Sequence, residues 1–259
     1  MSIKKIIKEE ILRILKESVE EAKYYRTTPE RLAELSEHDD YKVRKVVARN
    51  FNCPPEILIK LSGDKNDEVR MGVAYNLYCP PEILIKLSGD TNDEVRHFVA
   101  QNLNCPPEIL IKLSGDTEVI VRSGVARNRY SPPKILWKLH RDRSSVVRTS
   151  VAWNINCPPE ILIKLSGDED DDVRSGVAYN QNCPPEILIK LSGDTDELVR
   201  KNVAKNENTP LEALLILIKD PEPKVREAAK NNPRYKQYSE DVDRAEFKAR
   251  DELEDALFD

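Results

Sequence analysis

Aromatic side chains are scarce in this chain: phenylalanine, tryptophan and tyrosine make up 6% of its 259 residues, whereas charged residues make up 34%. Such a composition suits many short helices with solvated faces better than one large aromatic core. No apolar stretch approaches the roughly 20 residues that a membrane-spanning helix needs. At the N-terminus, Ile3, Ile6 and Ile7 are interleaved with lysines and do not form the apolar core of a secretory signal. We therefore expect a soluble cytoplasmic protein with no membrane contact.

The chain also lacks an excess of positive charge and closely spaced cysteines. Its net charge of −5 gives no general reason to expect nucleic-acid binding. The five cysteines are an odd number with no close pair, which does not fit a disulfide framework. Reduced thiols, as in a cytoplasmic protein, are the expectation.

Repetition is what the sequence has in abundance. Cysteines occur at 53, 79, 105, 157 and 183, and Ser131 fills the missing step of 26 residues. Arginine and asparagine recur with the same period, starting at Arg44 and Asn50. A fixed period in this range is typical of a solenoid. The eight predicted repeats are residues 27–52, 53–78, 79–104, 105–130, 131–156, 157–182, 183–208 and 209–234.

Each repeat is predicted to contain two short helices, as residues 53–78 illustrate. The first helix should begin at Pro54–Glu56, because proline is well tolerated in a first turn, and should end at Gly63 in the left-handed conformation. The second should be capped by Asp67 and end at Asn76, which also tolerates left-handed backbone. The spacing of the apolar residues turns one face of each helix inward; they are Ile57, Leu58, Leu61, Val69, Val73 and Ala74.

An aspartate and an arginine six residues apart, such as Asp64 and Arg70, recur in the repeats, although His38 replaces the aspartate in the first. We expect each aspartate to accept hydrogen bonds from backbone N–H groups and from an arginine of its own or the next repeat. Stacked repeats would then form a charge-assisted ladder. A structural role for the arginines is favoured over a phosphate-binding row.

The pattern of an aspartate, then Val-Arg, then Val-Ala resembles HEAT-like repeats, and the blocks NCPPEILIKLSGD and DEVRSGVAYN are similar to the leucine-rich repeat variant family. The resemblance covers residues 27–234. It implies an all-α, right-handed α-solenoid, or superhelix, that serves mainly in protein interaction. The best-known member type also has an N-terminal cysteine cluster for an iron–sulfur centre. Here the first cysteine, Cys53, lies inside a repeat, so we expect no such cluster and no cofactor.

The two ends are predicted to cap the array. Residues 1–26 form an amphipathic N-terminal capping helix, and residues 235–259 form an acidic C-terminal one with four Lys/Arg and nine Asp/Glu. Ser239 should cap the second of these helices, over residues 239–258. The predicted apolar positions are Ile3, Ile7, Ile11, Leu15, Val19 and Ala22 in the first helix, and Val242, Ala249, Leu253 and Leu257 in the second.

The cysteines are predicted to be buried structural thiols. Equivalent atoms in stacked helices lie about 8–10 Å apart, too far for a disulfide, whose Cα atoms must lie within about 7 Å. Thr27, Ser131 and Thr209 occupy the same position in other repeats. Thr27 and Thr209 precede a glutamate by three residues, as in a capping box, and so does Cys53. Zinc or cluster binding is the weaker alternative, and we expect no metal.

Internal comparison shows which positions the scaffold leaves free. The equivalents of Glu68, Met71 and Tyr75 vary widely between repeats, and their spacing places them on one face of the second helix, which we predict to be exposed. At the position of Tyr75, other repeats have arginine, tryptophan, glutamine or lysine. Arginine, tryptophan and tyrosine are enriched at binding hot spots.

The repeat 131–156 departs most from the pattern. It has five basic residues and one acid, a net charge of +4, whereas residues 157–182 have two basic residues and six acids, a net charge of −4. Either the repeat has drifted, or it forms a basic and aromatic partner surface. The candidate partner-binding residues are Ile120, Arg127, Tyr130, Lys134, Trp137, Lys138, Arg141, Arg143, Val146 and Trp153. His140 is expected to be exposed at the end of its helix.

The function favoured by these patterns is a non-enzymatic scaffold that binds a protein or peptide, with an acidic or amphipathic segment, at the repeat 131–156. The alternative is nucleic-acid binding through the same patch, by analogy with HEAT-like alkylpurine DNA glycosylases, although no active-site arrangement of theirs is matched. The three histidines occupy different repeat positions, there is no glycine-rich phosphate loop, and no catalytic set of nucleophile, base and acid can be assembled.

Overall fold

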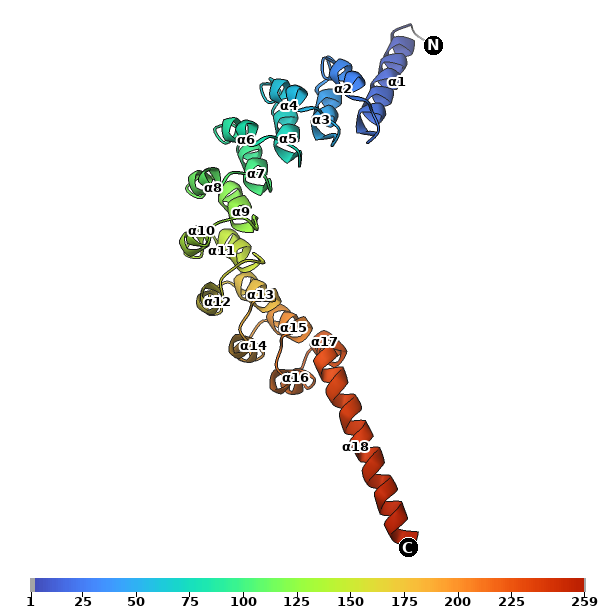
Figure 1. Ribbon diagram of the computed structural model, residues 1–259, viewed down its shortest axis with the longest axis vertical. Coiled ribbons are helices and arrows are strands. Elements are labelled where there is room, and N and C mark those ends of the chain that lie inside the picture. Colours follow the sequence, from blue (N-terminus) through green and yellow to red (C-terminus); the bar gives the residue numbers. More distant parts are fainter. Residues whose placement is uncertain (1–2, 259) are drawn as a thin grey trace. The chain divides into compact units, whose positions relative to one another are not determined.

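The computed structural model describes the backbone of residues 3–258 and the side chains of residues 9–249. Over this range the chain forms 18 α-helices and no strand. It divides into two compact units, residues 1–135 and 136–259. Within each unit, the helices alternate along the chain between two rows (Figure 1). The predicted solenoid of helix pairs is therefore confirmed.

The helices of a pair differ in length. The first helices, of seven residues, are α2 (Pro29–Leu35), α4 (Pro55–Leu61), α6 (Pro81–Leu87), α8 (Pro107–Leu113), α10 (Pro133–Leu139), α12 (Pro159–Leu165), α14 (Pro185–Leu191) and α16 (Leu211–Leu217). The second helices are α3 (Tyr41–Arg49), α5 (Asp67–Tyr75), α7 (Asp93–Gln101), α9 (Val119–Arg127), α11 (Ser145–Ala152), α13 (Asp171–Tyr179), α15 (Glu197–Lys205) and α17 (Pro223–Asn231). Successive second helices of a unit pack on one another, and each also packs on the neighbouring first helices.

The first helix of each pair starts as predicted but ends differently. In α4, Pro55 occupies the first turn and Ile57, Leu58 and Leu61 are buried. The helix ends at Ser62, which keeps right-handed backbone and donates its hydroxyl to the Ile59 carbonyl, 2.6 Å away. No described glycine has a positive φ, so the prediction of a left-handed Gly63 is wrong. The serine hydroxyl satisfies a carbonyl of the last turn instead.

The second helix of each pair begins one residue earlier than predicted. In α5 the N-cap is Asn66, whose side chain accepts from the Glu68 amide, and Asp67 is the first helical residue. The amide side chain of asparagine suits an N-cap as well as aspartate does. Val69 and Val73 are fully buried, as the spacing predicts.

The recurrent asparagines do not end helices in the left-handed conformation, which is a second correction. Asn76 is extended, with φ −64° and ψ 124°, and is fully buried. Its Nδ2 donates to the carbonyls of Ala48 and Asn50, 2.8 and 2.9 Å away, and its Oδ1 accepts from the Tyr78 amide. The side chain thus binds the end of the preceding repeat's second helix and its own loop. The same two donated bonds recur at Asn50, Asn102, Asn128, Asn180, Asn206 and Asn232.

The predicted ladder of aspartates and arginines is present, but each aspartate accepts from an arginine of the preceding repeat, and the prediction of an arginine from its own or the next repeat is wrong. Arg70 donates from Nε and Nη2 to the two carboxylate oxygens of Asp90, at 2.7 and 2.9 Å, and from Nη1 to the Asp64 carbonyl of its own repeat. Burial alone would raise the pKa of Asp90, but the hydrogen bonds from Arg70 and the Asn92 amide hold that pKa below its usual value. Equivalent pairs are Arg44–Asp64, Arg96–Asp116, Arg148–Asp168, Arg174–Asp194 and Arg200–Asp220.

The terminal helices differ from their predictions. The N-terminal helix α1 (Ile3–Lys23) buries Ala22, but Ile11 is exposed, so only the later part of the predicted stripe packs on the array. The C-terminal helix α18 (Pro233–Phe258) begins directly after Asn232 and runs through Ser239, which is therefore not its cap. Of its predicted stripe, Val242 is half-buried and Ala249 is exposed. Ile3, Ile7, Leu253 and Leu257 lie outside the described side chains.

Candidate functional site

The variable stripe on the second helices is only partly exposed. Tyr75 is exposed, as are its equivalents Arg127 and Trp153. Met71, in contrast, is 9% exposed, and the prediction that it faces solvent is wrong. Second helices pack on α5 from both neighbouring repeats, so only the exposed positions of the stripe are available to a partner.

Four of the candidate residues belong to the unit formed by residues 1–135, and all four are exposed: Ile120, Arg127, Tyr130 and Lys134. Tyr130 lines a hollow of about 820 Å³ together with Leu77 and Leu103, and the Arg129 guanidinium lies 5.1 Å from its ring centroid. The backbone carbonyl of Ile120 is hydrogen-bonded to Nδ1 of His97 at 2.8 Å.

The other six candidates belong to the unit formed by residues 136–259, and they too are exposed: Trp137, Lys138, Arg141, Arg143, Val146 and Trp153. They divide between the two rows of helices. Trp137 is on a first helix, with the Lys164 ammonium of α12 6.0 Å from its ring centroid. Trp153 directly follows the second helix α11 and stacks on Tyr179 of α13. The two tryptophans therefore have different neighbours.

His140 is buried, at 6% exposure, which contradicts the prediction of an exposed side chain. Its Nδ1 lies 2.8 Å from the Trp137 carbonyl, and its Nε2 accepts from Nε of Arg141 at 3.2 Å. The first contact is the one that the equivalent Ser62 hydroxyl makes in its own repeat. Burial lowers the pKa of His140, against the opposing effect of the Trp137 hydrogen bond. The histidine thus replaces a helix-ending serine.

Trp153 and Tyr179 form an aromatic platform, the name used below for this pair. Their ring centroids lie 4.4 Å apart and their planes are 24° from parallel, while Trp153 is 42% and Tyr179 50% exposed. Gly176 lies under the indole: a Cβ added there would be 2.8 Å from Cδ1 of Trp153. The tryptophan is therefore held between a tyrosine ring and a glycine while keeping a large exposed face.

The sequence alone did not single out Tyr179 or Gly176 as partners of Trp153. Residues 153 and 179 occupy the same position in successive repeats, which was the available signal. Aromatic side chains at one repeat position in neighbouring second helices come face to face when the helices pack, and the glycine provides the space that the larger ring requires.

The cysteines are buried and free, as predicted for structural thiols. The predicted capping box is wrong, because the N-cap is the following residue, Pro54, and no side chain caps this helix. The Ser131 hydroxyl instead points back and donates to the Val125 carbonyl at 2.6 Å, and Thr209 binds Val203 in the same way. Burial raises the pKa of each cysteine thiol to about 12.

Two further observations concern possible site types. Within the part of the chain that the structure describes, no group of three or more His, Cys, Asp or Glu side chains is arranged to hold a metal ion. In the same part, each helix is too short or too polar to cross a bilayer.

The chain is similar to a solved structure described as a leucine-rich repeat variant with a novel repetitive protein structural motif. The two share 31% identity, with 82% of this chain and 84% of that chain covered and a TM-score of 0.56. A crystal structure of an engineered protein aligns at 20% identity, with 82% of each chain covered and a TM-score of 0.41. No protein-family model matches the chain, and no curated protein matches it significantly.

Proposed function

Because the chain belongs to the leucine-rich repeat variant family, we propose that it is a non-enzymatic scaffold that binds a protein or peptide partner. The binding surface includes the divergent residues of the second unit. The observation that supports this most directly is the aromatic platform, two rings that are stacked and about half exposed. Rigid, partly exposed tryptophan and tyrosine side chains bury a large area on binding at little entropic cost.

The basic side chains of the repeat 131–156 suggest the character of the partner. Arg141 and Arg143 are exposed, and the repeat has a net charge of +4. Opposite charge on a partner speeds association and selects between partners. The partner is therefore a protein or peptide with an acidic segment. Ile120, Arg127, Tyr130 and Lys134 belong to the first unit and are candidate contacts in their own right.

Affinity purification tests this function. The bait is the full chain, compared with Trp153→Ala/Tyr179→Ala and with Trp137→Ala/Arg141→Ala. Tyr78→Ala is the matched control, because Tyr78 is an exposed tyrosine outside the candidate residues. We expect a captured protein to bind directly when purified and to lose at least tenfold in affinity with the first variant but not with the control. Equal affinity for all variants would refute the proposal.

A gel shift at low salt with single- and double-stranded probes tests the alternative of nucleic-acid binding. The overall charge of −5 argues against a long phosphate track. Binding of either probe that is weakened by Trp153→Ala and Arg141→Ala would favour the alternative over a protein partner.

A further inference from the structure

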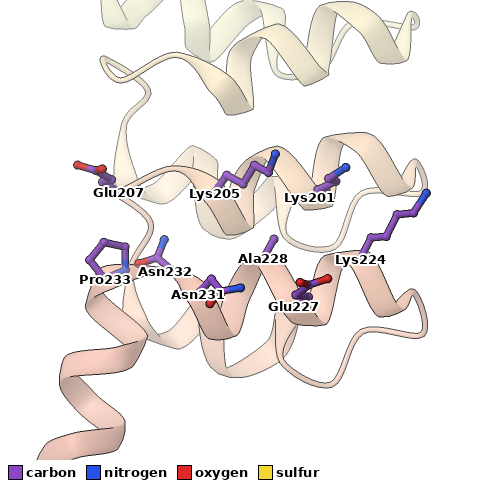
Figure 2. A pocket seen from close by; sticks show the side chains of 9 residues that line it. All are labelled: Lys201, Lys205, Glu207, Lys224, Glu227, Ala228, Asn231, Asn232 and Pro233. Carbon is purple, nitrogen blue, oxygen red and sulfur yellow. The ribbon is translucent and has the colours of Figure 1, made fainter.

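A second feature of the unit 136–259 is a hollow lined by lysines, called the lysine hollow below. It has a volume of about 380 Å³ and lies between α15 and α17. Figure 2 shows Lys201 and Lys205 on one of these helices and Lys224 on the other, with Glu207 beside Pro233 at the opposite end. The lining residues are Lys201, Lys205, Glu207, Lys224, Glu227, Ala228, Asn231, Asn232 and Pro233.

The three lysines are available to a ligand. Among the described residues, no carboxylate lies within 4.0 Å of any of their ammonium groups. The hollow contains three lysines and two glutamates, so its lining has a net charge of +1. Its open space and spare positive charge favour a carboxylate or another anion.

The repeat pattern explains why a hollow exists at this place. Lys205, Ala228 and Asn231 are the equivalents, 52 residues further on, of Trp153, Gly176 and Tyr179. At Gly176 the space beside the helix is occupied by the indole of Trp153. At Ala228 a flexible lysine and an asparagine replace the two rings, and the space stays open. The aromatic platform and the lysine hollow thus occupy equivalent positions in the repeat pattern, and two repeat lengths separate them.

This equivalence gives the spacing between the two features. Packed helices lie about 8–10 Å apart, so two steps along the row of second helices amount to about 16–20 Å. An extended chain advances about 3.3–3.6 Å per residue, and the span therefore corresponds to about five or six residues. Both features belong to one unit and lie on its second helices or directly after them, and the exposed Leu198 of α15 lies on the same stripe.

We infer that the second unit binds an extended peptide that places an aromatic side chain on the aromatic platform and, five or six residues away, acidic side chains in the lysine hollow. The inference rests on the proposed function and adds a motif to it. The stacked rings provide area for a flat apolar side chain, and the lysines select the acidic residues. Two weak contacts joined by a spacer of the right length bind more tightly than either alone.

Fluorescence anisotropy with labelled peptides tests the inference. The probe has one tryptophan, a spacer of five glycine and serine residues, and three glutamates, and it is made in both chain directions. One comparison peptide has a single-residue spacer, and another has glutamine in place of glutamate. We expect one direction of the long-spacer probe to bind about tenfold more tightly than either comparison peptide. The advantage over the glutamine peptide should diminish as salt increases.

Variants of the full chain assign the contacts. Lys201→Gln/Lys205→Gln/Lys224→Gln should reduce the affinity for the glutamate probe about tenfold, to that of the glutamine peptide. The control Lys60→Gln/Lys86→Gln/Lys112→Gln removes the same charge from the first helices of three repeats, outside the lysine hollow. It should change the affinity less than twofold. Circular dichroism of each variant serves as the check that it is folded. Trp153→Ala should reduce the affinity for the glutamate probe and for the glutamine peptide by the same factor.

The possible results separate the two proposals. If Trp153→Ala abolishes binding of the probe while the lysine variant binds all peptides like the wild type, the motif is wrong and the proposed function stands. If both lysine variants weaken binding equally, or if no peptide binds the wild type, the motif is also overturned. In that case the proposed function is tested separately, by the affinity of the variants for the purified partner protein.

Discussion

Replacing Asn76 by alanine removes three hydrogen bonds from the interior of the first unit. At this fully buried position the Ala48 and Asn50 carbonyls lose the Nδ2 donor and the Tyr78 amide loses its acceptor. The Asn50 carbonyl keeps the Cys53 amide as a donor, 3.0 Å away. A buried hydrogen bond contributes about 1 kcal/mol net, and each polar group left unsatisfied costs about 1–3 kcal/mol. Allowing for partial relaxation, we expect Asn76→Ala to lower the free energy of unfolding by about 3–4 kcal/mol.

The control for this variant is Asn104→Ala. Asn104 also donates to a carbonyl of the preceding repeat, that of Leu77 at 2.7 Å, but it is exposed, so water replaces the lost bond. We expect this change to cost less than about 1 kcal/mol. Urea unfolding, monitored by circular dichroism, measures the free energy of unfolding of both variants. If the two variants differ by less than about 0.5 kcal/mol, burial does not determine how much the Asn76 side chain contributes to stability, and the reasoning is refuted.

Three further predictions concern the thiols, the acid response and the aromatic platform. Because burial raises the pKa of Cys157 and the other cysteines to about 12, all five should be unreactive toward Ellman's reagent at pH 8 in the folded protein and reactive in guanidinium; rapid reaction of the folded protein would contradict this. The pKa of Asp90 is lowered in the folded state, so its contribution to stability is present above about pH 4 and is lost as the pH falls through the native pKa; the difference in urea midpoint between wild type and Asp90→Asn should shrink from pH 7 to pH 2.5, and a constant difference would contradict it. Gly176→Ala places a methyl group 2.8 Å from Cδ1 of Trp153 and should cost about 1–3 kcal/mol and alter tryptophan fluorescence; the loss should be smaller in a Trp153→Ala background, and equal losses in both would show that the contact is unimportant.

The repeat period and the buried faces were predictable because both depend on local spacing. Leu58, Leu61, Val69 and Val73 follow the helical period, and all four are buried. The existence of the ladder of arginines and aspartates was predictable as well, because two opposite charges recur together in most repeats, although the repeat that supplies each arginine was not.

The helix ends were not predictable in the same way. The backbone preference of asparagine predicts a left-handed Asn76, whereas its side chain binds carbonyls 26 and 28 residues earlier in the chain. A residue can end a helix through such long-range partners without left-handed backbone. The signal was the strict recurrence of asparagine: a preference for left-handed backbone would also admit glycine, but two donated hydrogen bonds and one accepted bond require an amide.

The exposure of two variable positions was also predicted wrongly. Met71 is at a variable position of its helix, but it is buried in the stack, where α5 packs between α3 and α7. His140 occupies the position of a serine whose hydroxyl binds the last turn of its helix, and the imidazole takes over that bond. Variation between repeats therefore identifies where the scaffold tolerates change, and exposure must be established separately.

One scaffold of repeats can present different side-chain chemistry along its length. The backbone at Gly176 and at Ala228 is equivalent, yet one location supports stacked rings and the other an open hollow with lysines. The recurrent arginines and asparagines join successive repeats through contacts that do not involve these positions. Side chains at the positions of Trp153 and Tyr179 can therefore change without altering the stack, and the proposed partner binding would draw its specificity from such exposed positions.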